Sequence, residues 1–319
     1  MRRGIAVNQG AFNKIEGLPI IFYWKIDIKM KTPKRIEPLI EEGLVDSVIC
    51  QLMSGKEALV YVVQCGSELI CAKVYKETHR RNFRHSANYT EGRYLKNIRR
   101  TREIQKQSYF GKLTQEVAWQ NTEINALCQL GAAGVKVPGY INFFEGVLLM
   151  GLITDFQGNV APRLNDIRLT KEEARTYHAL LINQAVRMLC HGMIHSDLSE
   201  YNVLLGSQGP VIIDFPQAIY ALDNNNARWL LKRDIDNITK YFSRFAPELV
   251  GTDFGSEIWS LYEHGKLNWD TPLTGVPIEK HKPVNVDGLL KTIDLVMKKE
   301  LAWQRYKQER WTSQRSLAF

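Results

Sequence analysis

The chain has 319 residues, 45% of them hydrophobic, and a formal net charge of +8. Its five cysteines contain no CxxC pair, which excludes a disulfide framework and a zinc site. The longest apolar stretch near the N-terminus, residues 18–24, is too short to cross a bilayer. We therefore expect a globular, cytoplasmic protein with a large buried core and without a signal peptide or a membrane partner.

The sequence changes character at several points, and these changes predict its division. Met30 makes better sense as the start of a domain than Met1 does. We expect an N-terminal extension of unclear status, a first lobe, a second lobe and a C-terminal helical extension, over residues 1–29, 30–150, 151–275 and 276–319. For the last of these, a partner-binding tail is the alternative.

The positive charge is concentrated in one segment. Between Lys76 and Lys112 there are eleven Lys or Arg and three Glu, a surplus equal to the net charge of the whole chain. Such a segment favours a polyanionic partner, and an RNA-containing or ribosomal one is our expectation for the loop 76–112. The alternative is a solvated loop with no dedicated partner. The lack of apolar periodicity over 78–108 predicts that part of it is disordered.

A β-hairpin is predicted ahead of the basic segment. Residues 59–63 are apolar and β-branched, residues 65–68 have the composition of a turn, and residues 69–74 form a second apolar run. After the basic segment, apolar residues recur at near-helical spacing up to Leu130, and Gly131 and Gly134 are expected to end that helix. Residues 147–153 then suit a buried strand.

The second half of the chain reads as mostly helical. Residues 170–173 (TKEE) are a capping-box pattern, and we expect the helix that they open to stop at Gly192. Two short strands at 203–205 and 211–213 are joined by a tight turn, and residues 226–245 form a further helix. This order of elements suits two lobes.

The sharpest chemical signal is the run HSDLSEYN, residues 195–202, followed by Asp214 at the end of VIID. Phosphoryl transfer from ATP needs a carboxylate near the acceptor and oxygen ligands for the metal that neutralises the phosphates. Asp197, Asn202 and Asp214 have the order and spacing that this chemistry uses, with one hairpin between the two aspartates. The alternative that Asp197 merely caps a turn leaves this spacing unexplained.

Five motifs together resemble those of the RIO family of atypical serine/threonine protein kinases, in particular its type-1 branch and the bacterial members of that branch. They are SGKEA at 54–58, CAKVY at 71–75, the spacing from Trp119 to Glu123, HSDLSEYN at 195–202 and IDFPQ at 213–217. The resemblance implies an α+β, two-lobed, protein-kinase-like fold, with a small mostly-β N-lobe and a larger mostly-α C-lobe. It covers residues 30–275 approximately.

The resemblance also implies ATP and Mg²⁺ as cofactors, with ATP meeting Ser54, Gly55, Lys56, Lys73, Glu123, Met150, Gly151 and Ile153. Lys73 would contact the α and β phosphates and pair with Glu123. Backbone N–H groups of residues 54–56 would cover the phosphates, and those of residues 150–153 would meet the adenine. The alternatives are that Lys73 is an edge-strand lysine and that Glu123 is an ordinary exposed helix residue.

The same resemblance implies roles for the acidic residues of the second lobe. Asn202 and Asp214 would hold Mg²⁺, and Asp197 would be the catalytic base. Asp234 would support the catalytic loop from the following helix. We expect His195 to pack and form hydrogen bonds rather than to carry a proton.

Two further motifs imitate those of ordinary protein kinases. Asp253-Phe-Gly255 spells DFG but follows no predicted strand, and Ala246-Pro-Glu248 spells APE but lies after a helix. We interpret both as coincidences, and without an activation segment a docking surface for extended peptides is not expected.

The resemblance leaves several functions open. The first is a kinase with autophosphorylation and ATPase activity, through an aspartyl-phosphate at Asp214, whose protein substrate is unknown. The second is an ATPase that times the assembly of a ribosome or another ribonucleoprotein. The third is a small-molecule kinase, against which the SGKEA loop and the basic segment argue. For eukaryotic and archaeal relatives the partner is the maturing small ribosomal subunit.

Overall fold

The structure is a computed structural model, and it describes residues 32–55, 57–76 and 109–276. All of these residues belong to one of the chain's two compact units, Met1–Pro277. The expected extensions at the two ends and nearly all of the basic segment lie outside the described residues, as does Lys56. The predicted boundaries of the four segments therefore stay predictions.

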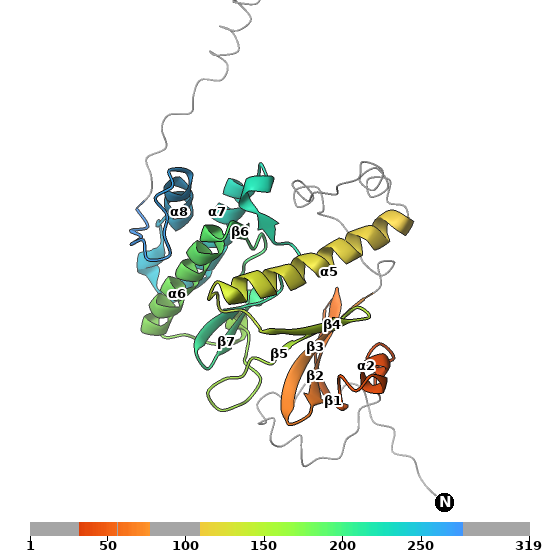
Figure 1. The fold of residues 1–319 in the computed structure, drawn as a ribbon. Helices are drawn as coiled ribbons and strands as arrows, with labels where there is room; N and C mark the ends of the chain where they lie inside the picture. The colour runs from red at the N-terminus through yellow and green to blue at the C-terminus, as the bar shows by residue number, and fades with distance from the viewer. Residues whose placement is uncertain (1–31, 56, 77–108, 277–319) are drawn as a thin grey trace, which may run out of the picture. The chain divides into compact units, whose positions relative to one another are not determined.

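Five antiparallel strands form one sheet in the first part of the described chain (Figure 1). They are β1 (Ser47–Ser54), β2 (Ala58–Cys65), β3 (Glu68–Tyr75), β4 (Tyr140–Phe144) and β5 (Val147–Gly151), in the spatial order β1-β2-β3-β5-β4. The predicted hairpin is confirmed as β2 and β3, with Gly66 at a φ of +57° in its turn. Because β3 lies between β2 and β5, Lys73 is not on an edge strand.

The two faces of the sheet have different neighbours. Ala72 packs in an apolar cluster with Leu39 of helix α2 (Glu37–Glu41), whereas Tyr75 belongs to the main core. Successive side chains of a strand point to opposite faces. Lys73 therefore shares a face with Tyr75, and this is the face toward the rest of the core.

Helix α5 (Tyr109–Ala132) lies beside the sheet (Figure 1). Its residues Leu127 and Leu130 are buried in the main core. The helix continues through Gly131, and the chain turns at Gly134, whose φ is +75°. A glycine with positive φ just past the last turn is a common helix ending, so one of the two predicted glycines ends this helix.

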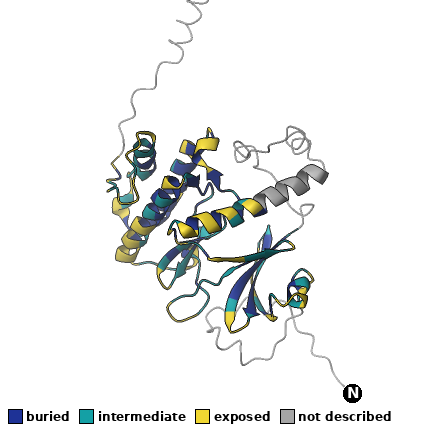
Figure 2. Cartoon of the chain, in the orientation of Figure 1, coloured by how far each residue is buried: buried dark blue, intermediate teal, exposed yellow. Residues whose placement is uncertain are grey.

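Three helices form most of the second part: α6 (Lys171–Cys190), α7 (Ala227–Phe242) and α8 (Phe254–Glu263). The predicted capping box is present, because the Glu173 N–H donates to Thr170 Oγ1 at 3.2 Å and the Thr170 N–H donates to Glu173 Oε2 at 2.9 Å. Helices α6 and α7 turn their buried faces toward the core and their exposed faces outward (Figure 2).

Two small sheets and four short 3₁₀ turns complete the second part. The strands are β6 (Met193–Ile194) paired with β9 (Ile219–Tyr220), and β7 (Val203–Gly206) paired with β8 (Gly209–Ile212). The 3₁₀ turns are η3 (Leu164–Asp166), η4 (Glu200–Asn202), η5 (Ala221–Asp223) and η6 (Pro247–Leu249). The expected α+β architecture, mostly β in its first part and mostly α in its second, is confirmed.

Two observations bear on the sequence analysis of the cysteines and of the apolar stretches. All five cysteines are free thiols. Across the described ranges, no helix combines the length and the apolar character that crossing a membrane requires.

Candidate active site

A buried ion pair joins the sheet to helix α5. Lys73 on β3 donates from Nζ to both carboxylate oxygens of Glu123, at 2.6 and 2.9 Å. The two residues are 7% and 1% exposed, so Glu123 is not an ordinary surface residue of its helix. Burial lowers the pKa of Lys73, but Asp214 and Glu123 raise it well above its usual value. The predicted pairing is therefore present, and the lysine is charged.

Asp214 completes a three-residue charged cluster. It lies just after β8, and its Oδ1 accepts a third hydrogen bond from Lys73 Nζ at 2.7 Å. Desolvation in the cleft raises the pKa of Asp214, but the Lys73 ammonium outweighs this effect and leaves the pKa below its usual value. Its φ of +70° is rare for a residue with a side chain and marks a position where backbone strain accompanies the carboxylate.

Tyr75 is part of this cluster, although sequence reasoning assigned it no role. Its hydroxyl donates to Glu123 Oε2, and its ring lies 5.5 Å from Lys73 Nζ. Burial, and then the Glu123 charge, raises the pKa of Tyr75 well above its usual value, so the proton stays on the phenol. The period-two alternation of a strand was the available signal, since it sends residues 73 and 75 to one face.

The catalytic-loop candidates Asp197 and Asn202 are joined by a hydrogen bond. Asn202 Nδ2 donates to the backbone oxygen of Asp197 at 2.9 Å, and Gln217 Nε2 approaches Asp197 Oδ2 at 3.5 Å. Burial, followed by the charge of Asp214, raises the pKa of Asp197. The two aspartates thus lie near enough to influence each other, and Asp197 is the stronger base of the two.

His195 connects the loop to the chain that leads into Asp214. Its Nδ1 accepts from the Asp197 N–H at 3.2 Å, so the proton sits on Nε2, which donates to the Ile213 carbonyl at 3.0 Å. Burial lowers the pKa of His195 to about 4, which keeps the ring neutral. This geometry agrees with the positioning role expected from the sequence.

Asp234 of α7 supports the loop 195–202 through its carboxylate. Its Oδ2 accepts from the Ser196 N–H at 2.7 Å, while Arg233 donates to the Ser196 carbonyl. Ser196 has a φ of +66°, a left-handed conformation that these contacts hold in place. Burial raises the pKa of Asp234 to about 7. Trp229 lies against the guanidinium of Arg233, with 5.0 Å between the ring centroid and Cζ.

The predicted metal ligands form an incomplete oxygen set. The Ile213 N–H donates to the Asn202 carbonyl at 3.0 Å, which fixes Asn202 beside the chain entering Asp214. Since Asn202 Nδ2 is bonded to Asp197, its amide oxygen is the atom available to a cation. Within the described residues, His, Cys, Asp and Glu nowhere gather in threes to hold a metal. These oxygens fit Mg²⁺ that arrives with phosphates, because Mg²⁺ commonly takes one or two carboxylates plus phosphate oxygens.

Gly55 follows β1 at the start of the glycine loop and has partners for both of its polar backbone groups. The Gly55 N–H donates to the Ala58 carbonyl at 2.9 Å, and Lys76 Nζ donates to the Gly55 carbonyl at 2.6 Å. A side chain at Gly55 would approach the Ala58 carbonyl to 3.3 Å. Both polar backbone groups of Gly55 are therefore engaged in this structure, and its N–H must leave Ala58 before it can meet a phosphate.

The segment expected to meet adenine follows β5. The Gly151 N–H donates to the Gly139 carbonyl, and the Ile153 carbonyl accepts from Ala161, at 2.8 and 2.9 Å. Among the described residues, no hydrogen bond engages the Ile153 N–H. That group is the donor this segment offers to a purine. Met150, which lies on β5 with Gly151, pairs with Cys71 of the neighbouring strand β3.

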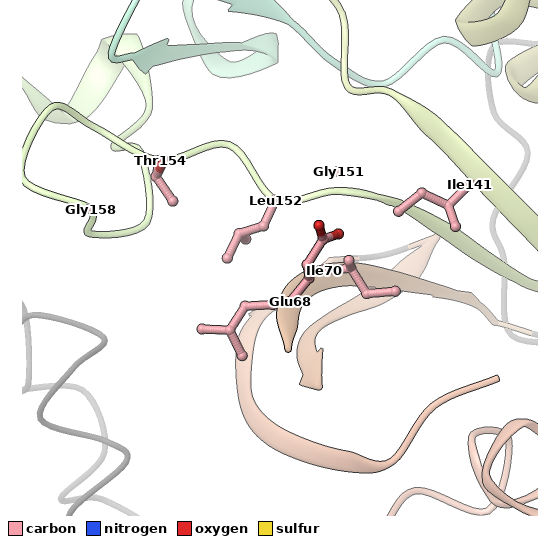
Figure 3. A pocket seen from close by; sticks show the side chains of 8 residues that line it. Glu68, Ile70, Ile141, Gly151, Leu152, Thr154 and Gly158 are labelled. Carbon is pink, nitrogen blue, oxygen red and sulfur yellow. The ribbon is translucent and has the colours of Figure 1, made fainter. Parts of the chain in front are cut away.

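A cavity of about 400 Å³ opens at the outer edge of this segment (Figure 3). Its lining residues are Glu68, Leu69, Ile70, Ile141, Gly151, Leu152, Thr154 and Gly158. Of the predicted site residues it touches only Gly151, and it reaches neither Lys73 nor Asp214. This cavity therefore does not coincide with the charged cluster, where the sequence analysis expects the phosphates.

The DFG sequence at 253–255 and the APE sequence at 246–248 have structural roles elsewhere. Asp253 caps α8 by accepting from the Ser256 N–H at 3.1 Å, and it pairs with Lys232 at 2.7 Å. Glu248 lies in η6 and pairs with Lys171 and Arg175 on α6. Neither acidic residue belongs to the charged cluster, as the sequence analysis expected.

Fold and site together define a phosphotransferase of the protein-kinase-like class: a β-rich part carries the paired lysine, and a helical part carries two aspartates and an asparagine. Residues 59–254 match the family described as RIO domain. The RIO-type serine/threonine-protein kinase Rio1 of Haloferax volcanii is 30% identical over 230 residues, 72% of each chain. Rio2 of Methanocaldococcus jannaschii is 30% identical, over 66% of this chain and 73% of its own.

The fold agrees with these sequence matches. A crystal structure of the Rio2 kinase-ADP/Mg²⁺-phosphoaspartate complex from Chaetomium thermophilum aligns with a TM-score of 0.53 at 22% identity, covering 79% of this chain and 77% of that one. The chain spans only 40% of the Schizosaccharomyces pombe kinase rio1. This chain belongs to the RIO family. Because Rio1 and Rio2 relatives match at the same identity, its type-1 branch stays a prediction.

Proposed function

We propose that this chain is an ATP- and Mg²⁺-dependent RIO-type serine/threonine kinase that phosphorylates itself or a bound protein. One observation carries the proposal: Lys73 is bonded at once to Glu123 and to Asp214. In a protein kinase, the phosphate lysine paired with a helix glutamate and the metal aspartate must both be in place for activity. The Lys73–Glu123 pair, with the candidate metal aspartate Asp214 bonded to the same lysine, supports the proposal.

In the proposed reaction, Asp197 accepts the proton of the acceptor hydroxyl. The hydroxyl oxygen forms a bond to the γ-phosphorus while the bond to the bridging oxygen of ADP breaks, and ADP takes the electron pair. The raised pKa of Asp197 supports this role, because it makes the carboxylate a better base than a solvated aspartate. Asn202 and Asp214 would hold Mg²⁺, which supplies positive charge to the β and γ phosphates.

A second activity, an ATPase cycle through a phosphorylated Asp214, is favoured by the exposure of this carboxylate. The Asp214 side chain is 41% exposed, although its Oδ1 is held by Lys73. One oxygen would attack the γ-phosphorus and release ADP, and water would then hydrolyse the acyl phosphate to inorganic phosphate and free carboxylate. The Chaetomium Rio2 complex, whose name includes phosphoaspartate, supports this possibility for the fold.

The two activities are separated by a single-turnover incubation with γ-labelled ATP and Mg²⁺. Wild type is compared with Asp197→Ala and Asp214→Ala, and the protein-bound label is treated with hydroxylamine. Label that hydroxylamine removes, and that Asp214→Ala does not acquire, supports the aspartyl-phosphate cycle. Label that resists hydroxylamine supports transfer to serine or threonine. A wild type that neither binds nor turns over ATP would contradict both.

An RNA-containing or ribosomal partner is proposed from the sequence alone, because the basic loop 76–112 lies almost wholly outside the described residues. Phosphate neutralisation by several Lys and Arg gives affinity that falls steeply with salt. Binding to ribosomal RNA that weakens about a hundredfold or more between 50 and 200 mM salt would support such a partner. Binding that ignores salt would contradict it.

A further inference from the structure

Arg163 lies at the edge of the charged cluster and has no role so far. Its backbone forms an isolated β-bridge with Leu204, and the Leu205 N–H donates to the Pro162 carbonyl at 2.9 Å. These contacts fix Arg163 against β7, the strand that directly follows Asn202. The backbone of Arg163 therefore lies against the β7–β8 hairpin, which connects the two predicted metal ligands.

The side chain of Arg163 reaches from this hairpin to the sheet. Its guanidinium contacts Sδ of Met53, the residue before Ser54 on β1. The backbone of Arg163 thus lies against β7, which begins just after Asn202, and its guanidinium lies beside Met53, just before the glycine loop. ATP bound to Lys73 and covered by that loop would have its phosphates between these two positions.

The guanidinium has an unusual partner for its charge. Arginine carries five N–H donors, and a thioether sulfur is only a weak acceptor. In the part of the chain that the structure describes, no carboxylate lies within ion-pair distance of Arg163, whereas Arg233 pairs with Asp234 and with the Ser196 carbonyl. The charge of Arg163 is also felt at the site, where it contributes to the lowered pKa of Asp214.

We propose that Arg163 is a phosphate-binding residue of the nucleotide site, whose guanidinium exchanges the Met53 sulfur for oxygens of the ATP triphosphate. The inference rests on the proposed kinase function and adds a second cation to Lys73. Guanidinium groups bind phosphate oxygens through strong, charge-assisted hydrogen bonds. Because a thioether is only a weak acceptor, Arg163 can leave the Met53 sulfur at little cost.

The test measures affinities of the full chain for MgATP and for adenosine by calorimetry. We expect Arg163→Ala and Arg163→Gln to bind MgATP about tenfold or more weakly, the loss typical of one charge-assisted hydrogen bond. Their affinity for adenosine should stay within about twofold of wild type. Arg163→Lys should recover most of the affinity for MgATP, since it restores the charge.

Two further variants separate phosphate binding from a structural role. Arg168→Ala removes an exposed arginine of the same segment, and Met53→Leu removes the sulfur but keeps Arg163. Both should bind MgATP like wild type. If Met53→Leu weakens binding as much as Arg163→Ala, Arg163 acts as a strut between the two parts, and the inference is overturned.

The remaining outcomes also decide the matter. Wild-type affinity of Arg163→Ala for MgATP, or an equal loss for MgATP and adenosine, overturns the phosphate contact and leaves the kinase proposal intact. Absence of MgATP binding by wild type overturns the kinase proposal itself, and this inference with it.

Discussion

Lys73 in the β-rich part and the buried histidines in the helical part show two opposite ways of burying an ionisable group. Around Lys73, a buried ammonium keeps its charge because it is held between the carboxylates of Glu123 and Asp214. In the helical part, His178 and His195 are buried with neutral rings, and burial lowers the pKa of each to about 4. Pairing offsets the cost of burial at Lys73, and loss of charge offsets it at the two histidines.

The difference has a functional meaning. Lys73 and Asp214 keep their charges over the whole physiological range, since the pKa of Lys73 is raised and that of Asp214 is lowered. A site that must meet the charges of ATP and Mg²⁺ is thereby prepared in advance. The neutral histidines instead join elements of the scaffold: His195 bonds to the Ile213 carbonyl, and His178 bonds to Thr239 of α7.

The largest expected effect comes from changing Asp197, the proposed base. Asp197→Asn keeps the size of the side chain but abolishes its ability to accept a proton, so kcat should fall about 10²- to 10⁴-fold. Affinity for MgATP should change little. Steady-state kinetics and calorimetry measure the two quantities, with Asp236→Asn on the surface of α7 as control. Retention of more than a tenth of the activity would argue against Asp197 as the base.

The next effect tests the charged pair itself. Glu123→Gln leaves Lys73 with Asp214 as its only carboxylate in a buried position, and removing one partner of a buried pair typically costs about 3 kcal/mol or more. Because Asp214 remains, we expect a loss of about 2 kcal/mol in the free energy of unfolding and at least a tenfold fall in kcat. Urea unfolding measures the first, and exposed Glu41→Gln is the control. Unchanged stability would show that the pair contributes nothing net.

The free energy of unfolding should depend on pH through the buried histidine His178. His178 has an ordinary pKa of 6.5, and in the folded protein burial lowers it to about 4. The unfolded chain therefore binds a proton that the folded protein refuses. The stability that depends on His178 is complete above pH 6.5 and is lost as the pH falls from 6.5 to 4, by at most about 1.4 kcal/mol per pH unit.

His178→Gln tests this dependence, since glutamine does not titrate and retains a hydrogen-bonding group toward Thr239 Oγ1, which lies 3.0 Å from His178 Nε2. Its free energy of unfolding should fall less steeply between pH 6.5 and 4 than that of wild type. His264→Gln, an exposed position on the end of α8, should retain the wild-type slope. Equal slopes for His178→Gln and wild type would refute the assignment.

The smallest effect concerns Tyr75. Tyr75→Phe removes only the hydroxyl that donates to Glu123, so it should cost about 1 kcal/mol of stability and lower kcat a few-fold. Tyr61→Phe is the matched control, because Tyr61 is buried on the opposite face of the same sheet. Equal kinetics for the two variants would mean that Tyr75 packs but does not orient Glu123.

Local patterns predicted most of the fold. The capping box at Thr170, the turn at Gly66 and the tight turn between β7 and β8 each depend on residues close in sequence, and each is present. Boundaries were less exact: the helix expected to reach Phe245 ends at Phe242 and continues as irregular turns. Where a helix ends depends on packing with distant residues, which local periodicity does not contain.

Some contacts of the site could be predicted from the sequence, and others could not. Family resemblance predicted that Lys73 and Glu123 would meet across fifty residues, which no local pattern could have indicated. Period-two alternation could have added Tyr75. Nothing in the sequence indicated that Arg163 would reach Met53, or that the Gly55 N–H would be bonded to Ala58, because both depend on how the backbone closes in three dimensions.

The stacking of Trp229 on Arg233 has a practical consequence. Trp229 is about half exposed, and the guanidinium on its ring also binds the carbonyl of Ser196, the neighbour of Asp197. Indole emission is quenched or shifted when a contacting cation moves. The fluorescence of this one tryptophan, isolated by comparison with Trp229→Phe, is therefore an optical signal of the catalytic loop that needs no attached dye.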